Sequence, residues 1–171
     1  KITLNLKNFT LTSTYALKET SSEARYALVN KTALEVKNGT FAAGEARAIG
    51  GYAALTLNGA TVTQTLTGGH ACVAFCAADA TYTIKNSTIS GAYAVANFAN
   101  NANITINSAT LEGKTCGLYH NGSNYGLKLK VTSTTINGSL NGTIGSEKDP
   151  SGVYISGSAS HGTMQNATFT N

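Results

Sequence analysis

A short segment recurs along the whole chain, and this recurrence constrains the fold more than any other feature of the sequence. Its clearest copy, residues 34–41, contains alternating apolar residues, a polar Asn-Gly corner, a threonine and a large apolar residue. Copies begin at Leu4, Leu34, Leu55, Tyr82, Ile104, Leu129 and, in degenerate form, Gly162. Because units that repeat every 20 to 50 residues or so are typical of solenoids and other repeat architectures, we expect one here.

The apolar residues within each copy alternate with polar ones, as Leu34 and Val36 do. A period of two over a short segment predicts a β-strand rather than a helix. A further short apolar segment completes each unit, at residues 26–30, 47–51, 73–77, 93–97, 117–121 and 152–156. Because like strands recur once per unit, we expect them to stack in parallel. The sequence therefore predicts an all-β fold: a single-stranded right-handed parallel β-helix of about six to seven coils, with three short strands per coil.

The presence of Asn and Gly at the polar corner has a conformational explanation. The chain must turn sharply there, and Asn and Gly tolerate the left-handed backbone conformation that such a turn requires. Aligning the copies on their threonines places Asn8, Asn38, Asn86 and Asn166 at equivalent corners. We therefore expect left-handed residues at these four positions.

Composition excludes two classes of partner. Charged residues make up 12% of the chain, and the twelve Lys and Arg residues behind its net charge of +4 are scattered. A nucleic-acid site needs clustered cations, so we expect no nucleic-acid binding. No apolar run reaches the length of about 18 residues that a membrane span needs, so we expect no membrane insertion. Residues 1–171 form one predicted domain, which we expect to be a segment of a longer chain with uncapped ends that could associate end to end.

Catalytic and metal-binding constellations are not evident in the sequence. The carboxylates are dispersed, and only Glu147 and Asp149 lie close together, in a segment that reads as a solvated turn. The His70, Cys72 and Cys76 group and the Cys116 and His120 group fall two predicted coils apart. That separation is about 10 Å, whereas zinc ligands lie near 2.0 to 2.3 Å from one ion. We therefore expect no catalytic residues, no metal site and no cofactor.

One predicted column leaves two interpretations open. A column here is a set of residues that would lie above one another when the units stack. The members of this column are Leu28, Ile49, Phe75, Val95, Tyr119 and Tyr154, and residues near it include Tyr26, Arg47 and Tyr93. If the small residues beside them in the same strands, such as Ala48, Ala74 and Ala94, face inward, these bulky residues form an outer apolar and aromatic stripe. Sugar rings stack on such a surface, or another domain packs against it. If the bulky residues face inward, they are core. The candidate ligand-binding residues under the first interpretation are Tyr26, Arg47, Phe75, Tyr93, Tyr119 and Tyr154.

The columns, the Asn-Gly corners and residues 152–158 resemble the pectate-lyase-like β-helix superfamily, in particular the repetitive regions of large bacterial surface proteins. The resemblance implies a non-catalytic module located extracellularly or on the cell surface. Such a module would act as a stalk or adhesive face that binds a glycan or a protein on a host or neighbouring cell. Two alternatives remain: a fragment of a polysaccharide lyase or glycoside hydrolase of that superfamily, and a self-assembling filament subunit.

Overall fold

The computed structural model describes residues 1–18, 20–66, 70–120, 126–138, 151–155 and 164–170, with residues 151 and 164–170 as backbone only. These residues form an all-β parallel solenoid. The helical structure within these ranges is one short 3-10 helix, η1 (Glu23–Arg25). No helix in this part of the chain has the length and apolar character needed to cross a membrane.

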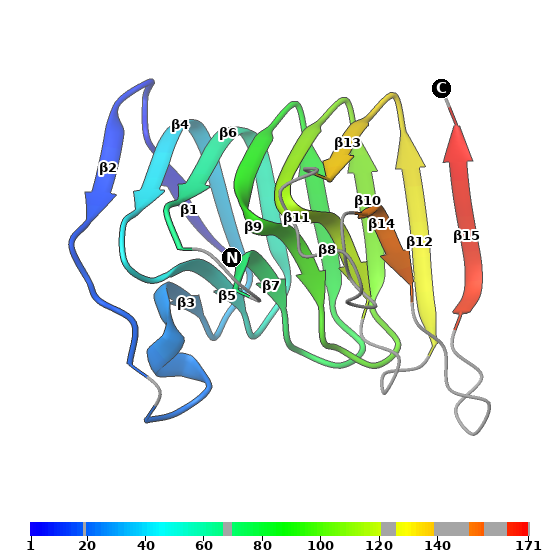
Figure 1. Cartoon of the computed structure of the whole chain (residues 1–171), viewed down its shortest axis with the longest axis horizontal. Helices are drawn as coiled ribbons and strands as arrows, with labels where there is room; N and C mark the ends of the chain where they lie inside the picture. The colour runs from blue at the N-terminus through cyan, green and yellow to red at the C-terminus, as the bar shows by residue number, and fades with distance from the viewer. Residues whose placement is uncertain (19, 67–69, 121–125, 139–150, 156–163, 171) are drawn as a thin grey trace.

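The first stack of strands contains the opening strand of each repeat. In spatial order its members are β1 (Ile2–Asn5), β4 (Leu34–Ala43), β6 (Leu55–Gln64), β8 (Thr81–Lys85), β10 (Asn103–Asn107), β12 (Leu127–Thr132) and β15 (Met164–Thr170). Each strand pairs in parallel with the next. Figure 1 shows them side by side along the long axis of the molecule, from the N-terminal to the C-terminal end.

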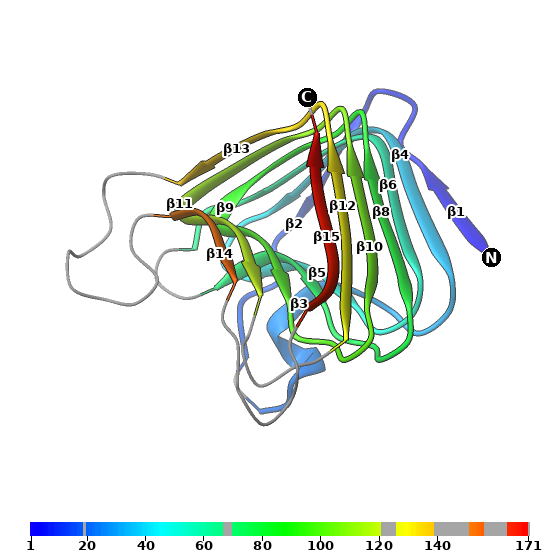
Figure 2. The same ribbon diagram turned by 90° about the vertical axis from the view of Figure 1, so that its right-hand side faces the viewer.

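Two further stacks complete the solenoid. The second contains β2 (Thr10–Ser13), the C-terminal halves of β4 and β6, the N-terminal halves of β9 (Thr88–Asn97) and β11 (Thr110–His120), and β13 (Thr135–Gly138). The third contains β3 (Tyr26–Asn30), β5 (Arg47–Gly51), β7 (Ala71–Phe75), the C-terminal halves of β9 and β11, and β14 (Ser151–Ile155). Figure 2 shows the stacks as walls around a common interior. Between Leu34 and His120 the chain passes through all three about four times.

Apolar side chains fill the interior between the stacks. Leu57 pairs with Ile84 in the first stack, and both are almost fully buried. The same column contains Val36, Ile106 and Val131, which are also buried. Each such side chain contributes about 1.5 to 3 kcal/mol through burial. The predicted stacking of like strands in a parallel solenoid is therefore confirmed.

The corner between the first and second stacks is left-handed, as predicted. Asn8, Asn38 and Asn86 have φ angles of 66°, 55° and 49°. Gly59 and Ser108 occupy the equivalent corner of other turns, with φ angles of 61° and 50°. Asparagine and glycine reach this conformation at low cost, whereas most side chains clash with the following carbonyl.

The two outermost copies of the repeat have a different register from the one predicted. In the N-terminal copy, Leu4 pairs with Val36, although the threonine alignment makes it equivalent to Leu34. The corner between β1 and β2 is longer than the corner within β4, and this absorbs the difference. In the C-terminal copy, Thr168 pairs with Lys130 of the first stack, so Asn166 lies within β15 rather than at a corner.

The third stack also departs from the predicted alignment. Its pairs place Leu28, Ile49, Val73, Val95, Leu118 and Val153 in one column. Phe75 pairs instead with Gly51 and Asn97, two residues further along the strands. Tyr119 pairs with Ala96 and Tyr154, and a shift of register precedes it between Gly113 and Cys116. The prediction that Phe75 and Tyr119 share a column with Leu28 is wrong, because loop length and this irregularity change the register between turns. The predicted alignment of Tyr119 with Tyr154 is confirmed.

Candidate functional site

The outer side of the third stack carries an apolar cluster that is separate from the interior core. Its buried members are Tyr26, Ala71, Ala74, Tyr93, Ala96, Cys116 and Tyr119. Val29, Tyr52, Cys76, Phe98 and Tyr154 pack against them and are partly exposed. Small residues on the strands leave room for aromatic rings to lie on the sheet. A surface of this kind favours contact with a ring-shaped or apolar ligand.

Four aromatic residues form a row within this cluster, here called the outer aromatic row. The Tyr119 ring lies 5.3 Å from the Tyr93 ring and 5.4 Å from the Tyr154 ring, centroid to centroid. Phe98 lies 6.0 Å from Tyr119 in a tilted arrangement. Tyr93 and Tyr119 are only 5% and 7% exposed, whereas Tyr154 is half-buried. The rings of this row therefore pack mainly against one another, and little of Tyr93 and Tyr119 is exposed to solvent.

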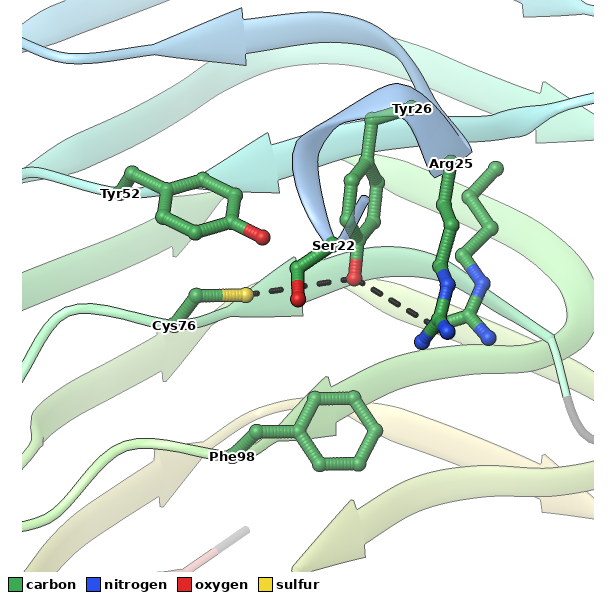
Figure 3. Close-up of a pocket in the computed structure, with 7 residues that line it drawn as sticks. Ser22, Arg25, Tyr26, Tyr52, Cys76 and Phe98 are labelled. Carbon is green, nitrogen blue, oxygen red and sulfur yellow. Dashed lines mark hydrogen bonds between the residues drawn. The ribbon is translucent and has the colours of Figure 1, made fainter. Parts of the chain in front are cut away.

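A cavity of about 420 Å³ lies beside Tyr26, and we call it the Tyr26 cavity. Its lining residues are Ser22, Arg25, Tyr26, Arg47, Tyr52, Cys76 and Phe98 (Figure 3). They come from the segment that leads into β3 and from positions in or just after β3, β5, β7 and β9. This volume is within the range of about 300 to 1,000 Å³ that small-molecule sites occupy.

Tyr26 and Arg47 are neighbours because they pair at the start of β3 and β5. Arg47 Nη1 donates to the Tyr26 hydroxyl over 3.4 Å, and the guanidinium carbon lies 5.7 Å from the Tyr26 ring centroid. Gly50 accommodates the ring, since a Cβ at this position would lie 2.7 Å from a ring carbon of Tyr26. The glycine therefore lets the phenol lie flat on the sheet, where it fixes the guanidinium group of Arg47.

Tyr52, Cys76 and Phe98 occupy equivalent positions, because each follows a third-stack strand. The backbone N–H of Cys76 donates to Gly51 O and that of Phe98 to Phe75 O, both over 2.9 Å. The Tyr52 ring stands edge-on to the Tyr26 ring at 6.2 Å, and Cys76 Sγ lies 3.9 Å from the Tyr26 hydroxyl. Figure 3 shows the thiol directed toward that hydroxyl, with Tyr52 and Phe98 on opposite sides of it.

The environment keeps the phenols and the thiol of the cavity neutral. Burial raises the pKa of Tyr26 well above its ordinary value, and the nearby Cys76 adds to this effect. Burial also raises the pKa of Tyr52, to about 12. The pKa of Cys76 is raised by burial as well, although hydrogen bonds with the two tyrosines act against it. The described lining also contains two arginines, Arg25 and Arg47.

A second, shallower cavity of about 300 Å³ lies on the second stack. It is lined by Ser90, Glu112, Gly113, Lys114, Asn137 and Gly138. Glu112 and Lys114 are exposed and of opposite charge, and the described residues of this lining include no aromatic ring. The Tyr26 cavity therefore offers the better ligand site.

The structure separates the sequence-predicted site residues into three groups. Tyr26 and Arg47 line the cavity, whereas Tyr93, Tyr119 and Tyr154 belong to the outer aromatic row. Phe75 belongs to the interior core, where it is 1% exposed and its ring stacks on Tyr82 at 4.1 Å. The placement of Phe75 on the outer stripe is therefore wrong, because its side chain faces inward. Leu28, Ile49 and Val95 also pack in or against the core, so only the two tyrosines of the predicted column face outward.

The sequence reasoning missed Arg25, Tyr52 and Phe98 as members of the site. Tyr52 and Phe98 stand one residue beyond segments that had been aligned as strands, and Arg25 stands one residue before Tyr26. Extending the alignment by one residue would have placed Tyr52 and Phe98 in one column. Cys76 joins them only in the observed register, in which Phe75 pairs with Gly51 and Asn97.

Carboxylates are dispersed over the described part of the chain. Glu35, in the first stack, contacts Lys1 Nζ at 3.1 Å, whereas Glu112 lies in the second stack. Lys1 and Asn58 hold the pKa of Glu35 below its ordinary value. Among the residues that the structure describes, no three His, Cys, Asp or Glu side chains are grouped for a metal ion. Glu147 and Asp149 lie outside the described residues.

Comparisons with protein-family models, curated proteins and solved structures found no match to this chain.

Proposed function

We propose that this chain is a non-catalytic glycan-binding module of a bacterial surface protein, located extracellularly. The solenoid serves as a rigid scaffold, and the Tyr26 cavity with the adjoining outer aromatic row serves as the recognition surface. In this proposal the chain winds as a right-handed helix of six to seven coils with three strands each. The first and last coils are contributed by the strands that flank residues 34–120.

One observation carries the proposal: aromatic rings and guanidinium groups line the same cavity. Sugar rings stack on aromatic side chains through their apolar faces, and their polar groups need hydrogen-bond donors at the edge of that contact. Tyr26, Tyr52 and Phe98 supply the rings, while Arg25 and Arg47 supply the donors. Tyr26 and Arg47 lie on paired parallel strands, and Tyr52 and Phe98 directly follow strands, so little conformational entropy of these residues would be lost on binding.

A glycan array probed with the 171-residue chain tests the proposal. The informative variant is Phe98→Ala, which removes a ring from the cavity. Phe9→Ala is the matched control, because Phe9 is 75% exposed in the corner before β2, between the first and second stacks, and is not among the lining residues of the cavity. We expect Phe98→Ala to weaken binding about tenfold or more and Phe9→Ala to leave it unchanged. Far-UV circular dichroism would establish that both variants fold.

Failure of the wild-type chain to bind any glycan would contradict the proposal. Equal loss of binding in both variants would also contradict it, since the site would then lie elsewhere.

Self-association is a second candidate, favoured by the apolar edge of the N-terminal strands. Ile2, Phe9 and Leu11 are 57%, 75% and 44% exposed. β1 and β2 each pair with β4 alone among the strands that the structure describes. An open strand edge with exposed apolar side chains pairs readily with another chain. Light scattering across a concentration series would show growing rods if this edge joins copies, and a constant monomer mass would contradict it.

A further inference from the structure

Partly exposed aromatic rings recur at a regular interval along the outer side of the third stack. Tyr52 follows β5, Phe98 follows β9 and Tyr154 lies in β14. All three are partly exposed and pack on the outer apolar cluster. The strands β5, β7, β9, β11 and β14 are consecutive members of the stack. The three rings therefore lie on every second level, where a level is one strand of the third stack and the residue that follows it.

The levels between these rings carry a thiol and a buried ring. Cys76 follows β7 and lies between Tyr52 and Phe98 (Figure 3). Tyr119, in β11, is only 7% exposed, and its ring lies 6.0 Å from that of Phe98 and 5.4 Å from that of Tyr154. Phe98 also lines the Tyr26 cavity. The cavity and the outer aromatic row are therefore continuous.

Strand pairing fixes the distance between the partly exposed rings. Neighbouring levels of a parallel stack are about 4.8 Å apart, so successive partly exposed rings lie about 10 Å apart along the long axis. Tyr154 is in register with Ala96, two residues before Phe98, so the line through the rings is oblique to that axis. A ligand that contacts all three rings needs an apolar face that recurs at this interval.

A linear β-1,4-linked glycan has such a repeat. Successive sugars in its extended ribbon are turned over relative to one another, so the same ring face recurs at every second sugar. One sugar advances the ribbon by close to one strand spacing, so every second sugar can stack on one aromatic ring. Chains with α-1,4 or β-1,3 linkages coil instead, and they do not keep this straight repeat.

We propose that the Tyr26 cavity and the outer aromatic row together bind a linear β-1,4-linked glycan that lies lengthwise on the solenoid. This inference rests on the proposed function and specifies the linkage and the orientation of its ligand. Three sugars reach from Tyr52 to Phe98, and five reach from Tyr52 to Tyr154. The third ring is therefore used only by a chain of five sugars or more.

Isothermal titration calorimetry with oligosaccharides of defined length and linkage tests the inference. The probes are the tri- and pentasaccharides of β-1,4-linked glucose and of β-1,4-linked N-acetylglucosamine, and the pentasaccharides of α-1,4-linked and β-1,3-linked glucose. We expect at least one β-1,4-linked pentasaccharide to bind roughly three- to tenfold more tightly than its trisaccharide, because it gains one stacking contact. The α-1,4-linked and β-1,3-linked pentasaccharides should bind at least about tenfold more weakly than that β-1,4-linked pentasaccharide.

Two ring deletions show which part of the glycan each end of the surface holds. Tyr154→Ala should abolish the gain in affinity between the trisaccharide and the pentasaccharide. Tyr52→Ala should weaken binding of both lengths, because Tyr52 borders the cavity. Phe9→Ala is the matched control, since it removes an exposed ring from the corner between the first and second stacks, and it should retain the full gain. Thermal unfolding would establish that each variant retains the wild-type fold.

The contrary outcomes separate this inference from the proposed function. Equal affinity for the two lengths, or a gain that Tyr154→Ala retains, would overturn the lengthwise orientation while the glycan-binding function stood. Equally tight binding of the α-1,4-linked or β-1,3-linked chain would overturn the assignment of the linkage. Binding of other glycans without any β-1,4-linked probe would overturn the inference alone, whereas binding of no glycan at all would overturn both proposals.

Discussion

Removal of a single buried hydroxyl tests the described packing of the core most directly. The Tyr82 hydroxyl accepts a hydrogen bond from Ala77 N at 2.9 Å, and it can donate to Gly51 O at 2.9 Å or to Ala77 O at 3.2 Å. The Tyr82 ring is fully buried and stacks on Phe75. Tyr82→Phe therefore deletes these hydrogen bonds and keeps the aromatic stack.

The magnitude follows from the number of hydrogen bonds that the hydroxyl can make at once. It has one hydrogen, so it makes one donated and one accepted bond at any moment. A hydrogen bond contributes a net of about 0.5 to 1.5 kcal/mol, so Tyr82→Phe should cost about 1 to 3 kcal/mol. In a domain of this size, 1 kcal/mol corresponds to about 2 to 4 °C in Tm. We therefore expect Tm to fall by roughly 2 to 12 °C.

Thermal unfolding followed by circular dichroism, together with urea denaturation, would measure this loss. Tyr154→Phe is the matched control, because Tyr154 is half-buried in the outer aromatic row. Its free energy of unfolding should change by no more than about 0.5 kcal/mol. A Tm loss in Tyr82→Phe that is no larger than in Tyr154→Phe would refute the reasoning.

Tyr82 also predicts how the stability of the fold changes at alkaline pH. Burial raises the pKa of Tyr82 from 10.0 to about 12. Above pH 10 the unfolded chain loses the Tyr82 proton while the folded chain keeps it, so the unfolded state binds fewer protons and stability falls as pH rises. This contribution is fully present below pH 10 and is lost as pH rises through about 12. Urea midpoints measured across this range should fall less steeply in Tyr82→Phe, and identical slopes in both proteins would contradict the prediction.

Three further predictions follow from burial and backbone conformation. Phe75→Ala should cost about 3 to 5 kcal/mol in urea denaturation, whereas Tyr154→Ala should cost far less; the reverse order would place Phe75 outside the core. Cys72 and Cys116 are fully buried, so a thiol reagent at pH 8 should leave both unmodified in the native protein. After unfolding, the reagent should label all three cysteines. Rapid labelling of Cys72 or Cys116 in the native protein would contradict their burial. Asn38→Val should cost about 1 to 2 kcal/mol because φ is 55° at this position, whereas Asn38→Gly should cost little; equal losses would argue against a left-handed corner.

The inner repeats could be predicted from the sequence because their strands alternate large apolar and polar residues. Leu57 and Ile84 are interior residues between polar neighbours, and the threonine after each corner fixes their register. The outer copies failed because the alignment assumed a corner of constant length. β1 and β2 are joined by a longer corner, which places Leu4 opposite Val36.

The third stack could not be aligned reliably because residues on both of its faces are buried. In β7, all five residues are buried, so hydrophobicity alone does not show which side of the strand each one faces. Phe75 and Tyr119 look equivalent in sequence, yet they lie on opposite sides of the sheet. The Tyr26 cavity was only partly predicted for a related reason: Arg25 and Tyr52 stand just outside the strands, and their convergence depends on how successive turns are stacked.

The Tyr26 cavity takes its lining from four consecutive levels of the solenoid, through Tyr26, Arg47, Cys76 and Phe98. A molecule bound there would span these levels in the direction of the long axis. To pull neighbouring levels apart, an axial force would have to break the contacts of that molecule in addition to the hydrogen bonds between strands. Occupancy of the cavity would thus raise the resistance of this part of the solenoid to tension along its long axis.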